Sequence, residues 1–199
     1  VQIVRRAPVN DWEQTLLRRA IRLLVDHHRP GTPVGTLEDL AGMLSNPPQA
    51  LIEAILADTR SEYDDQTKPL RRSMQALIQG QLGTTFAGQT TEQIRLDAPA
   101  VSVNISVVAK QSEEVLAAVM LATWSEVFAT IEAANALTDA GLQPQRYINA
   151  ILDEMWKAMR LRDAGLVEKL DGITRLNRND GVGNMFITHS LKDYTSLES

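Results

Sequence analysis

The chain has 199 residues, 44% of them hydrophobic and 23% charged, which excludes a disordered chain and allows one globular domain with a sizeable core. The formal net charge of −5 gives no general attraction for nucleic acid, although short clusters of basic residues occur at the spacing of solvated helix faces. The absence of cysteine excludes disulfides and thiolate metal sites, and the sequence shows no signal peptide and no apolar run long enough to span a membrane.

The first part of the chain predicts a short strand and then helices. Residues 1–4 suit the strand, and Asn10 or Asp11 suits the N-cap of the first helix. Thr36 and Asp39 have the pattern of a capping box. The predicted helices cover, in order, residues 11–25, residues 37–44, a segment after Pro48 with Leu51, Ile52, Ile55 and Leu56 on one face, and residues 65–82.

The pattern then changes. Residues 94–108, IRLDAPAVSVNISVV, alternate and are rich in β-branched side chains, which predicts one or two strands. A long helix over residues 112–139 follows, and a short apolar strand over residues 185–188 lies near the end. We therefore interpret residues 36–92 as an all-α insertion or lid and residues 94–199 as an α/β core.

The decamer YINAILDEMW, residues 147–156, allows two interpretations. Its apolar residues recur at helical spacing, which would leave Asp153 and Glu154 on the solvated face of a helix. Alternatively, residues 146–152 form a buried strand of a parallel sheet that ends in the two acids. Open α/β sheets carry their catalytic residues just beyond the carboxyl ends of such strands. Periodicity alone favours the helix.

The order of the elements favours the strand. A strand over residues 101–108, the long helix, the decamer strand, a further helix to about residue 176 and the strand at residues 185–188 make a βαβαβ series. Such a series implies a parallel sheet, in which the last two strands would end at the same edge. The polar residues at these ends are Asp153 and Glu154 after one strand, and Thr188, His189 and Ser190 after the other.

Four segments, in this order, carry a resemblance to a known family. LIQGQLGTTFAGQTT (residues 77–91) is Gly-rich and leads into a predicted strand, and ILDEMW (residues 151–156) holds an aspartate–glutamate pair followed by tryptophan. LNRNDGVG (residues 176–183) is an Arg-containing turn, and FITHSLKDY (residues 186–194) is a strand with a Thr-His-Ser end. Together they resemble the HerA–FtsK group of P-loop ATPases, and within it the ATPases that power conjugation and type IV secretion.

This resemblance implies a partial RecA-like parallel sheet, with ATP and Mg²⁺ as the cofactors of the parent protein. Asp153 would hold Mg²⁺, usually through water, and Glu154 would be the catalytic base. Arg178, with Arg175 as the alternative, would be an arginine finger that reaches the phosphate of a neighbouring subunit. The sensors of the phosphate would be Thr188, Ser190 and His189, the last at a position where many relatives carry Gln.

One motif of the family is missing. No G-x-x-x-x-G-K-[ST] occurs in the sequence, and this loop supplies the backbone cradle and the lysine that hold the phosphates. In the family the loop precedes the segments seen here, and the sequence begins with Val1 instead of Met. We therefore expect residues 1–199 to be the later part of a motor domain that is inactive without the loop.

The resemblance implies the C-terminal part of an ATP-hydrolysing motor for conjugative DNA transfer or type IV secretion. Such relatives are hexamers that act in the cytoplasm at the inner face of the membrane, with the secretion machinery and a DNA or protein substrate. The pair His27–His28 has no companion ligands, so no structural metal is expected. The alternative is a non-catalytic, mostly helical protein-interaction module whose decamer is helical.

Overall fold

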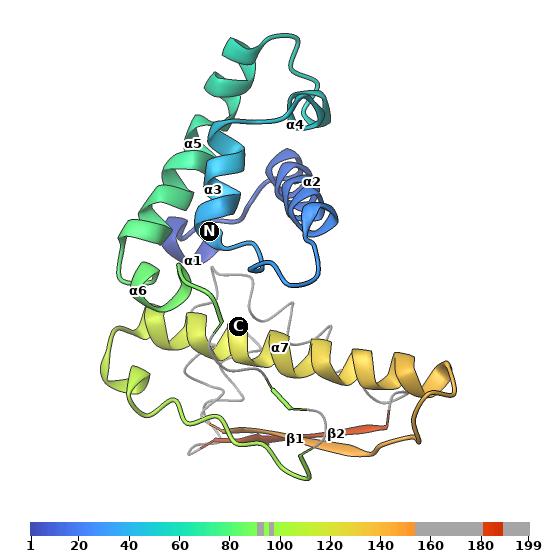
Figure 1. Ribbon diagram of the computed structural model, residues 1–199. Helices are drawn as coiled ribbons and strands as arrows, with labels where there is room; N and C mark the ends of the chain where they lie inside the picture. Colours follow the sequence, from blue (N-terminus) through green and yellow to red (C-terminus); the bar gives the residue numbers. More distant parts are fainter. Residues whose placement is uncertain (91–93, 96–97, 154–180, 189–199) are drawn as a thin grey trace. The chain divides into compact units, whose positions relative to one another are not determined.

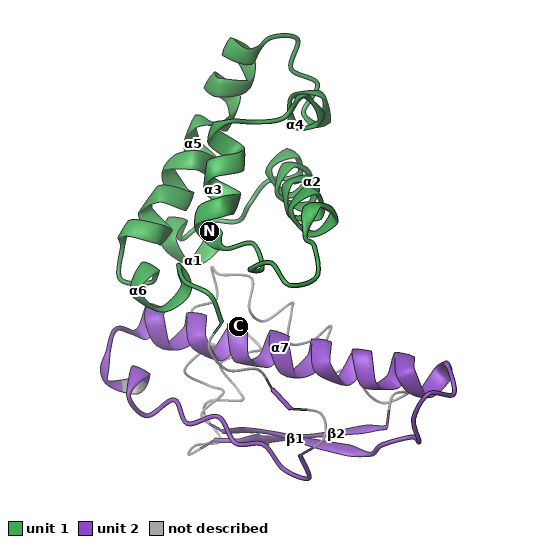
Figure 2. Ribbon diagram, viewed as in Figure 1, with its two compact units in different colours: residues 1–91 green, residues 92–199 purple. Residues whose placement is uncertain are grey.

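The computed structural model describes residues 1–90, 94–95, 98–153 and 181–188 (Figure 1). The chain divides into two compact units, Val1–Thr91 and Glu92–Ser199 (Figure 2). The regular elements among the described residues of the first unit are all helices, whereas those of the second are a short 3₁₀ helix, one long helix and a two-stranded parallel sheet. The protein is therefore helix-rich and of mixed α/β type, which confirms the predicted fold class at this level.

Two capping boxes fix the starts of two helices in the first unit. The side chains of Asn10 and Thr36 each accept a hydrogen bond from the backbone N–H three residues later, at Glu13 and Asp39. Each acid accepts a hydrogen bond from the backbone N–H of its cap in return, so these predicted caps are confirmed. The helices of this unit are α1 (Gln2–Arg5), α2 (Asp11–His27), α3 (Leu37–Ser45), α4 (Gln49–Ala54), α5 (Arg60–Gln79) and α6 (Gly83–Phe86).

The predicted strand over residues 1–4 is wrong. The backbone N–H of Arg5 donates to the carbonyl of Val1 at 2.9 Å, so this segment is a single helical turn, α1. Arg6 ends the turn with a left-handed φ of 52°. Over so few residues, an apolar pattern does not distinguish a strand from a turn of helix.

Two further helices differ from their predicted extents. α5 begins at Arg60 instead of at residue 65, because the Thr59 side chain accepts a hydrogen bond from the N–H of Glu62 and caps the helix. The Thr-x-x-Glu pattern at this start is a capping signal that the sequence contains. α4 is shorter than predicted, and Leu56, which was expected on its apolar face, has a φ of 56° and is 88% exposed.

Helices from both sides of residue 36 share one core in the first unit. α2 packs against α3 and α4, and α5 packs against α1 and α3. The hydroxyl of the buried Tyr63 donates to the carbonyl of Leu44 at 3.1 Å, so its polar group is satisfied. The residues predicted as an insertion thus fold together with α1 and α2. The completely buried apolar residues are Leu16, Ala20, Leu44, Leu51, Tyr63 and Leu70.

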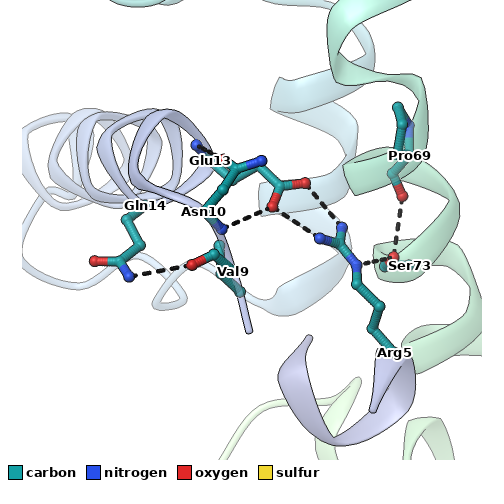
Figure 3. Close-up of polar contacts among 7 residues, drawn as sticks. All are labelled: Arg5, Val9, Asn10, Glu13, Gln14, Pro69 and Ser73. Atoms are coloured by element: carbon teal, nitrogen blue, oxygen red, sulfur yellow. Dashed lines mark hydrogen bonds and ion pairs between the residues drawn. The ribbon is translucent and has the colours of Figure 1, made fainter. Parts of the chain in front are cut away.

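A buried acid joins three helices of this unit (Figure 3). Glu13 of α2 is only 1% exposed, and its two carboxylate oxygens accept hydrogen bonds from Arg5 at 2.8 and 2.9 Å. The Nε of Arg5 donates to the hydroxyl of Ser73 in α5 at 3.1 Å. Because a buried carboxylate is stable only when it is paired and hydrogen-bonded, this contact fixes α1 against α2 and α5.

In the second unit, one long helix covers one face of a parallel strand pair (Figure 1). α7 (Glu113–Asp139) begins after Ser112, whose side chain accepts a hydrogen bond from the N–H of Val115, and this confirms the predicted long helix. β1 (Ile148–Asp153) pairs in parallel with β2 (Val182–Ile187), as predicted for the last two strands. The core between helix and sheet contains Leu116, Met120, Trp124, Phe128, Ile131, Ala150, Leu152 and Val182.

The strand predicted over residues 101–108 is wrong. The described residues 98–107 form no strand, and Val108–Lys110 is a short 3₁₀ helix, η1. The Asn104 side chain accepts a hydrogen bond from the N–H of Ser106 at 3.0 Å, and such a local bond competes with strand pairing. Of the predicted βαβαβ series, the described residues therefore contain two strands instead of three.

α7 has the length and the apolar composition that a membrane-spanning helix needs, and no other helix among the described residues has both. The sequence did not predict a membrane-spanning helix here, because acidic residues interrupt the apolar runs of this segment. Nine residues of α7 are buried, and its apolar side packs against β1 and β2. A helix in a protein core has the same composition, so the packing of α7 accounts for it.

The Glu13 contact predicts how the first unit responds to acid. Burial raises the pKa of Glu13, but the hydrogen bonds from Arg5 and Asn10 and the charge of Arg5 outweigh it, so the pKa lies below its ordinary value of 4.5. A lowered pKa contributes stability at neutral pH that is lost as the pH falls below about 5 and through the folded-state pKa. We expect Glu13→Gln to lower the free energy of unfolding by about 1.5–3 kcal/mol at pH 7 and by much less at pH 3.

Hydrogen exchange of the α2 and α5 amides in the whole chain measures this difference at both pH values. Glu53→Gln is the matched control, because Glu53 is exposed on α4 and its substitution should change little at either pH. A Glu13→Gln variant that loses the same stability at pH 3 as at pH 7 would show that the ionised carboxylate is not what stabilises the contact.

Candidate functional site

The decamer is a strand over its described part. Residues 148–153 form β1, so the strand interpretation is confirmed there and the helix interpretation is wrong. Ala150 and Leu152 point into the core under α7, whereas Asn149 and Ile151 are exposed. The strand therefore alternates, and the expectation of cover on both faces is not met by the described residues.

The register of the two strands brings two of the predicted site residues to one edge of the sheet. Asp153 lies opposite Ile187 in the parallel pair, and Thr188 follows directly. Asp153 is exposed and Thr188 is partly buried. The carboxyl ends of β1 and β2 thus meet as the sequence predicted, because parallel strands in register end on the same side.

The other predicted site residues lie outside the described residues. Their roles as catalytic base, arginine finger and phosphate sensors stay predictions. They are Glu154, Arg178 with its alternative Arg175, His189 and Ser190.

Two glycines position β2 beside β1, and neither of them was predicted as a functional residue. Gly181 has a φ of +71°, a conformation that L side chains rarely adopt, and its carbonyl accepts the N–H of Ile148 at 3.1 Å where the pairing starts. A Cβ at Gly183 would lie only 2.8 Å from the Oδ1 of Asn149, its partner in the register. The Gly-x-Gly spacing of residues 181–183 was the available signal for this close approach.

The described donors at this edge are oxygen atoms. A carboxylate and a hydroxyl are ligands of the kind that Mg²⁺ accepts, and Mg²⁺ usually keeps several waters and uses one or two protein carboxylates. Asp153 supplies such a carboxylate, but the described residues contain no group of three or more His, Cys, Asp or Glu that would hold a metal alone. The described donors therefore fit a Mg²⁺ ion only if other ligands, such as water, complete its coordination shell.

Comparison with protein-family models gives no match, and neither does comparison with curated proteins or with solved structures. The likeness to the HerA–FtsK group consequently depends on the four sequence segments that carry it.

The alternation of β1 predicts a large loss of stability on truncation of one residue and a small loss on truncation of its neighbour. Leu152 is 5% exposed in the core under α7, whereas Ile151 is 62% exposed. We expect Leu152→Ala to lower the free energy of unfolding by about 2–4 kcal/mol, and Ile151→Ala to lower it by about 0.5 kcal/mol or less. Urea titration followed through the amide signals of α7 measures both values. Similar losses from the two variants would contradict the one-sided burial of β1.

Proposed function

We propose that the chain contributes the metal-binding and phosphate-sensing edge of a nucleotide-hydrolysing motor that resembles the HerA–FtsK ATPases. The observation that carries the proposal is the parallel register that brings Asp153 and Thr188 to the carboxyl edge of one sheet. Open α/β sheets bind their ligands at this edge. One face of this sheet is covered by α7, as expected of an α/β layer.

The chemistry of the residues suits this role. Bound Mg²⁺ neutralises the charge of the phosphates and so favours attack at the terminal phosphorus. Asp153 would orient the water shell of the ion, and the Thr188 hydroxyl would donate a hydrogen bond to a phosphate oxygen. By the family resemblance, Glu154 would take a proton from the attacking water, and the roles of Arg178, His189 and Ser190 would be those of finger and sensors.

The proposal includes the rest of the parent protein. The phosphate loop that the sequence lacks would be supplied by another segment, and the arginine finger by a neighbouring subunit of a hexamer. Such a motor would act in the cytoplasm at the inner face of a membrane and move DNA or protein. RecA-like topology belongs to this proposal as well, since two strands are common to many α/β folds.

The second candidate is a non-catalytic interaction module. Exposed apolar side chains on the sheet face away from α7 favour it, namely Ile151 and Met185, which are 62% and 57% exposed. This alternative required a helical decamer, but residues 148–153 of the decamer form the strand β1. Metal binding at the carboxyl edge distinguishes the two candidates.

Manganese broadening of backbone NMR signals tests the motor proposal. Mn²⁺ replaces Mg²⁺ in such sites and broadens signals steeply with proximity. In the presence of ATP, we expect Mn²⁺ to broaden the amides of Asp153 and Thr188 far more than those of Ile148 and Val182, which lie about 16–20 Å away at the other end of the strands. The two ends of one sheet thus provide an internal comparison.

Asp153→Asn should abolish the selective broadening, and Asp139→Asn is the matched control because Asp139 is an exposed acid at the end of α7. Equal broadening at both ends of the strands, or broadening that survives Asp153→Asn, would rule out a metal–nucleotide site at this edge and favour the interaction module.

The missing loop predicts slow turnover. We expect the chain alone to hydrolyse ATP well below about 1 per second, which is the low end of ordinary turnover numbers. Release of phosphate from Mg²⁺–ATP measures the rate, and the Asp153→Asn variant gives the background. A rate of about 1 per second or more that depends on Asp153 would show that the phosphate loop is not needed.

A further inference from the structure

The second half of α2 and the residue pair after it carry arginines that no contact within the described protein uses. Residues 18–29 contain four arginines and a single acid, Asp26, so this stretch has a net charge of +3 in a chain whose net charge is −5. All four arginines are exposed, and none of their guanidinium groups forms an ion pair or a hydrogen bond with a described residue. They are Arg18, Arg19, Arg22 and Arg29.

Exposed apolar side chains lie among these arginines. Ile21 and Val25 are 49% and 65% exposed, and positions 18, 21, 22 and 25 share one side of the helix because residues three and four apart are neighbours. Val34, which is 61% exposed, lies in a loop that returns to α2, since a Cβ at Gly35 would lie 3.6 Å from the side chain of Leu24. Three of the four large apolar residues that are exposed among residues 1–90 are therefore found here.

The core of the first unit does not use this side of α2. The opposite side of the helix carries Leu16 and Ala20, which are completely buried in the cluster that α2 forms with α3 and α4. Apolar side chains that gather on a surface without stabilising the fold are a feature of contact sites. We call the four arginines together with Ile21, Val25 and Val34 the arginine surface.

The mixture of charged and apolar side chains indicates the chemistry of the partner. Nucleic acid phosphates would attract the arginines but would leave Ile21 and Val25 in water. An anionic membrane uses both kinds of side chain, because arginines bind the lipid phosphates and apolar side chains enter the boundary between headgroups and acyl chains. Guanidinium groups that nothing holds in place also suit lipid headgroups, which can move to meet them, whereas a rigid acidic protein surface would require them to be ordered.

We propose that the arginine surface binds a membrane that contains anionic phospholipid. The helix lies along the membrane, with Arg18 and Arg22 at the lipid phosphates and with Ile21 and Val25 in the boundary below them. The proposed function places the motor at a membrane through family resemblance alone, and this inference adds the surface that makes the contact. It does not involve the nucleotide site, so vesicle binding and the Mn²⁺ experiment can each fail without the other.

Co-sedimentation of the whole chain with lipid vesicles tests the proposal. We expect the chain to bind vesicles of phosphatidylcholine with about one-third phosphatidylserine at about 0.1 M salt, and not to bind vesicles of phosphatidylcholine alone. Salt at about 1 M shortens the range of charge interactions to about 3 Å, so it should release most of the bound chain.

Two pairs of substitutions with the same loss of charge locate the contact. Arg18→Gln together with Arg22→Gln should weaken binding about 25-fold, because each arginine near an anionic surface strengthens binding about fivefold. Lys68→Gln together with Arg72→Gln is the matched control, because both residues are exposed on α5 at the same spacing of four. Charges away from the contact are screened, so the control pair should change binding by less than about twofold.

A third pair distinguishes a membrane from a nucleic acid. Ile21→Ser together with Val25→Ser should weaken vesicle binding about tenfold through the loss of buried apolar surface. All the substituted side chains are exposed, and unchanged hydrogen exchange of the α2 and α5 amides shows that the variants fold.

Absence of binding to the anionic vesicles would overturn the proposal, and so would equal binding to neutral vesicles or equal losses from the α2 and α5 pairs. Binding of duplex DNA that depends on Arg18 and Arg22, without vesicle binding, would identify nucleic acid as the partner instead. A dimer that dissociates when these two arginines are replaced would place a second copy of the chain on the arginine surface.

Discussion

The parallel pairing of β1 with β2 is the constraint on which the functional interpretation depends. Backbone hydrogen bonds hold the two strands in one register, and only that register places Asp153 opposite Ile187 with Thr188 next in the chain. A shift by one residue would turn every side chain of β1 to the other face and remove Ala150 and Leu152 from the core under α7. The burial of these two side chains therefore stabilises the same arrangement that delivers the acid to the sheet edge.

Local signals in the sequence predicted the starts of several helices because each signal is itself the stabilising contact. Asn10 with Glu13 and Thr36 with Asp39 form their capping boxes within four residues, so no knowledge of the fold is needed. Predicting the strand within the decamer required more than such local signals. Its periodicity favoured a helix, and only the order of the surrounding elements indicated that a sheet and α7 would override that preference.

The errors arise where contacts distant in sequence, or local side-chain bonds, decide the outcome. Residues 2–5 are helical, and Arg5 is held by Glu13 and by Ser73, which lies 68 residues away. Residues 101–108 have a strand pattern, but the described chain provides no paired neighbour for them, and pattern alone does not form a strand. For the candidate site, the sequence could place Asp153 and Thr188 at one edge. It could not predict that Gly183 lies close enough to Asn149 for a Cβ to meet the Asn149 side chain, because that depends on the register.

The one-sided cover of the sheet gives β1 three distinct chemical surfaces. Its inner face is used by α7, its carboxyl end presents an acid, and its outer edge presents backbone groups with which none of the described residues pairs. Side chains at a strand end act through charge and ligand geometry, whereas a strand edge acts through backbone hydrogen bonds that are insensitive to sequence. The burial of Ala150 and Leu152 under α7 fixes the strand that ends in Asp153, so the inner face sets the position of the acid at the carboxyl end.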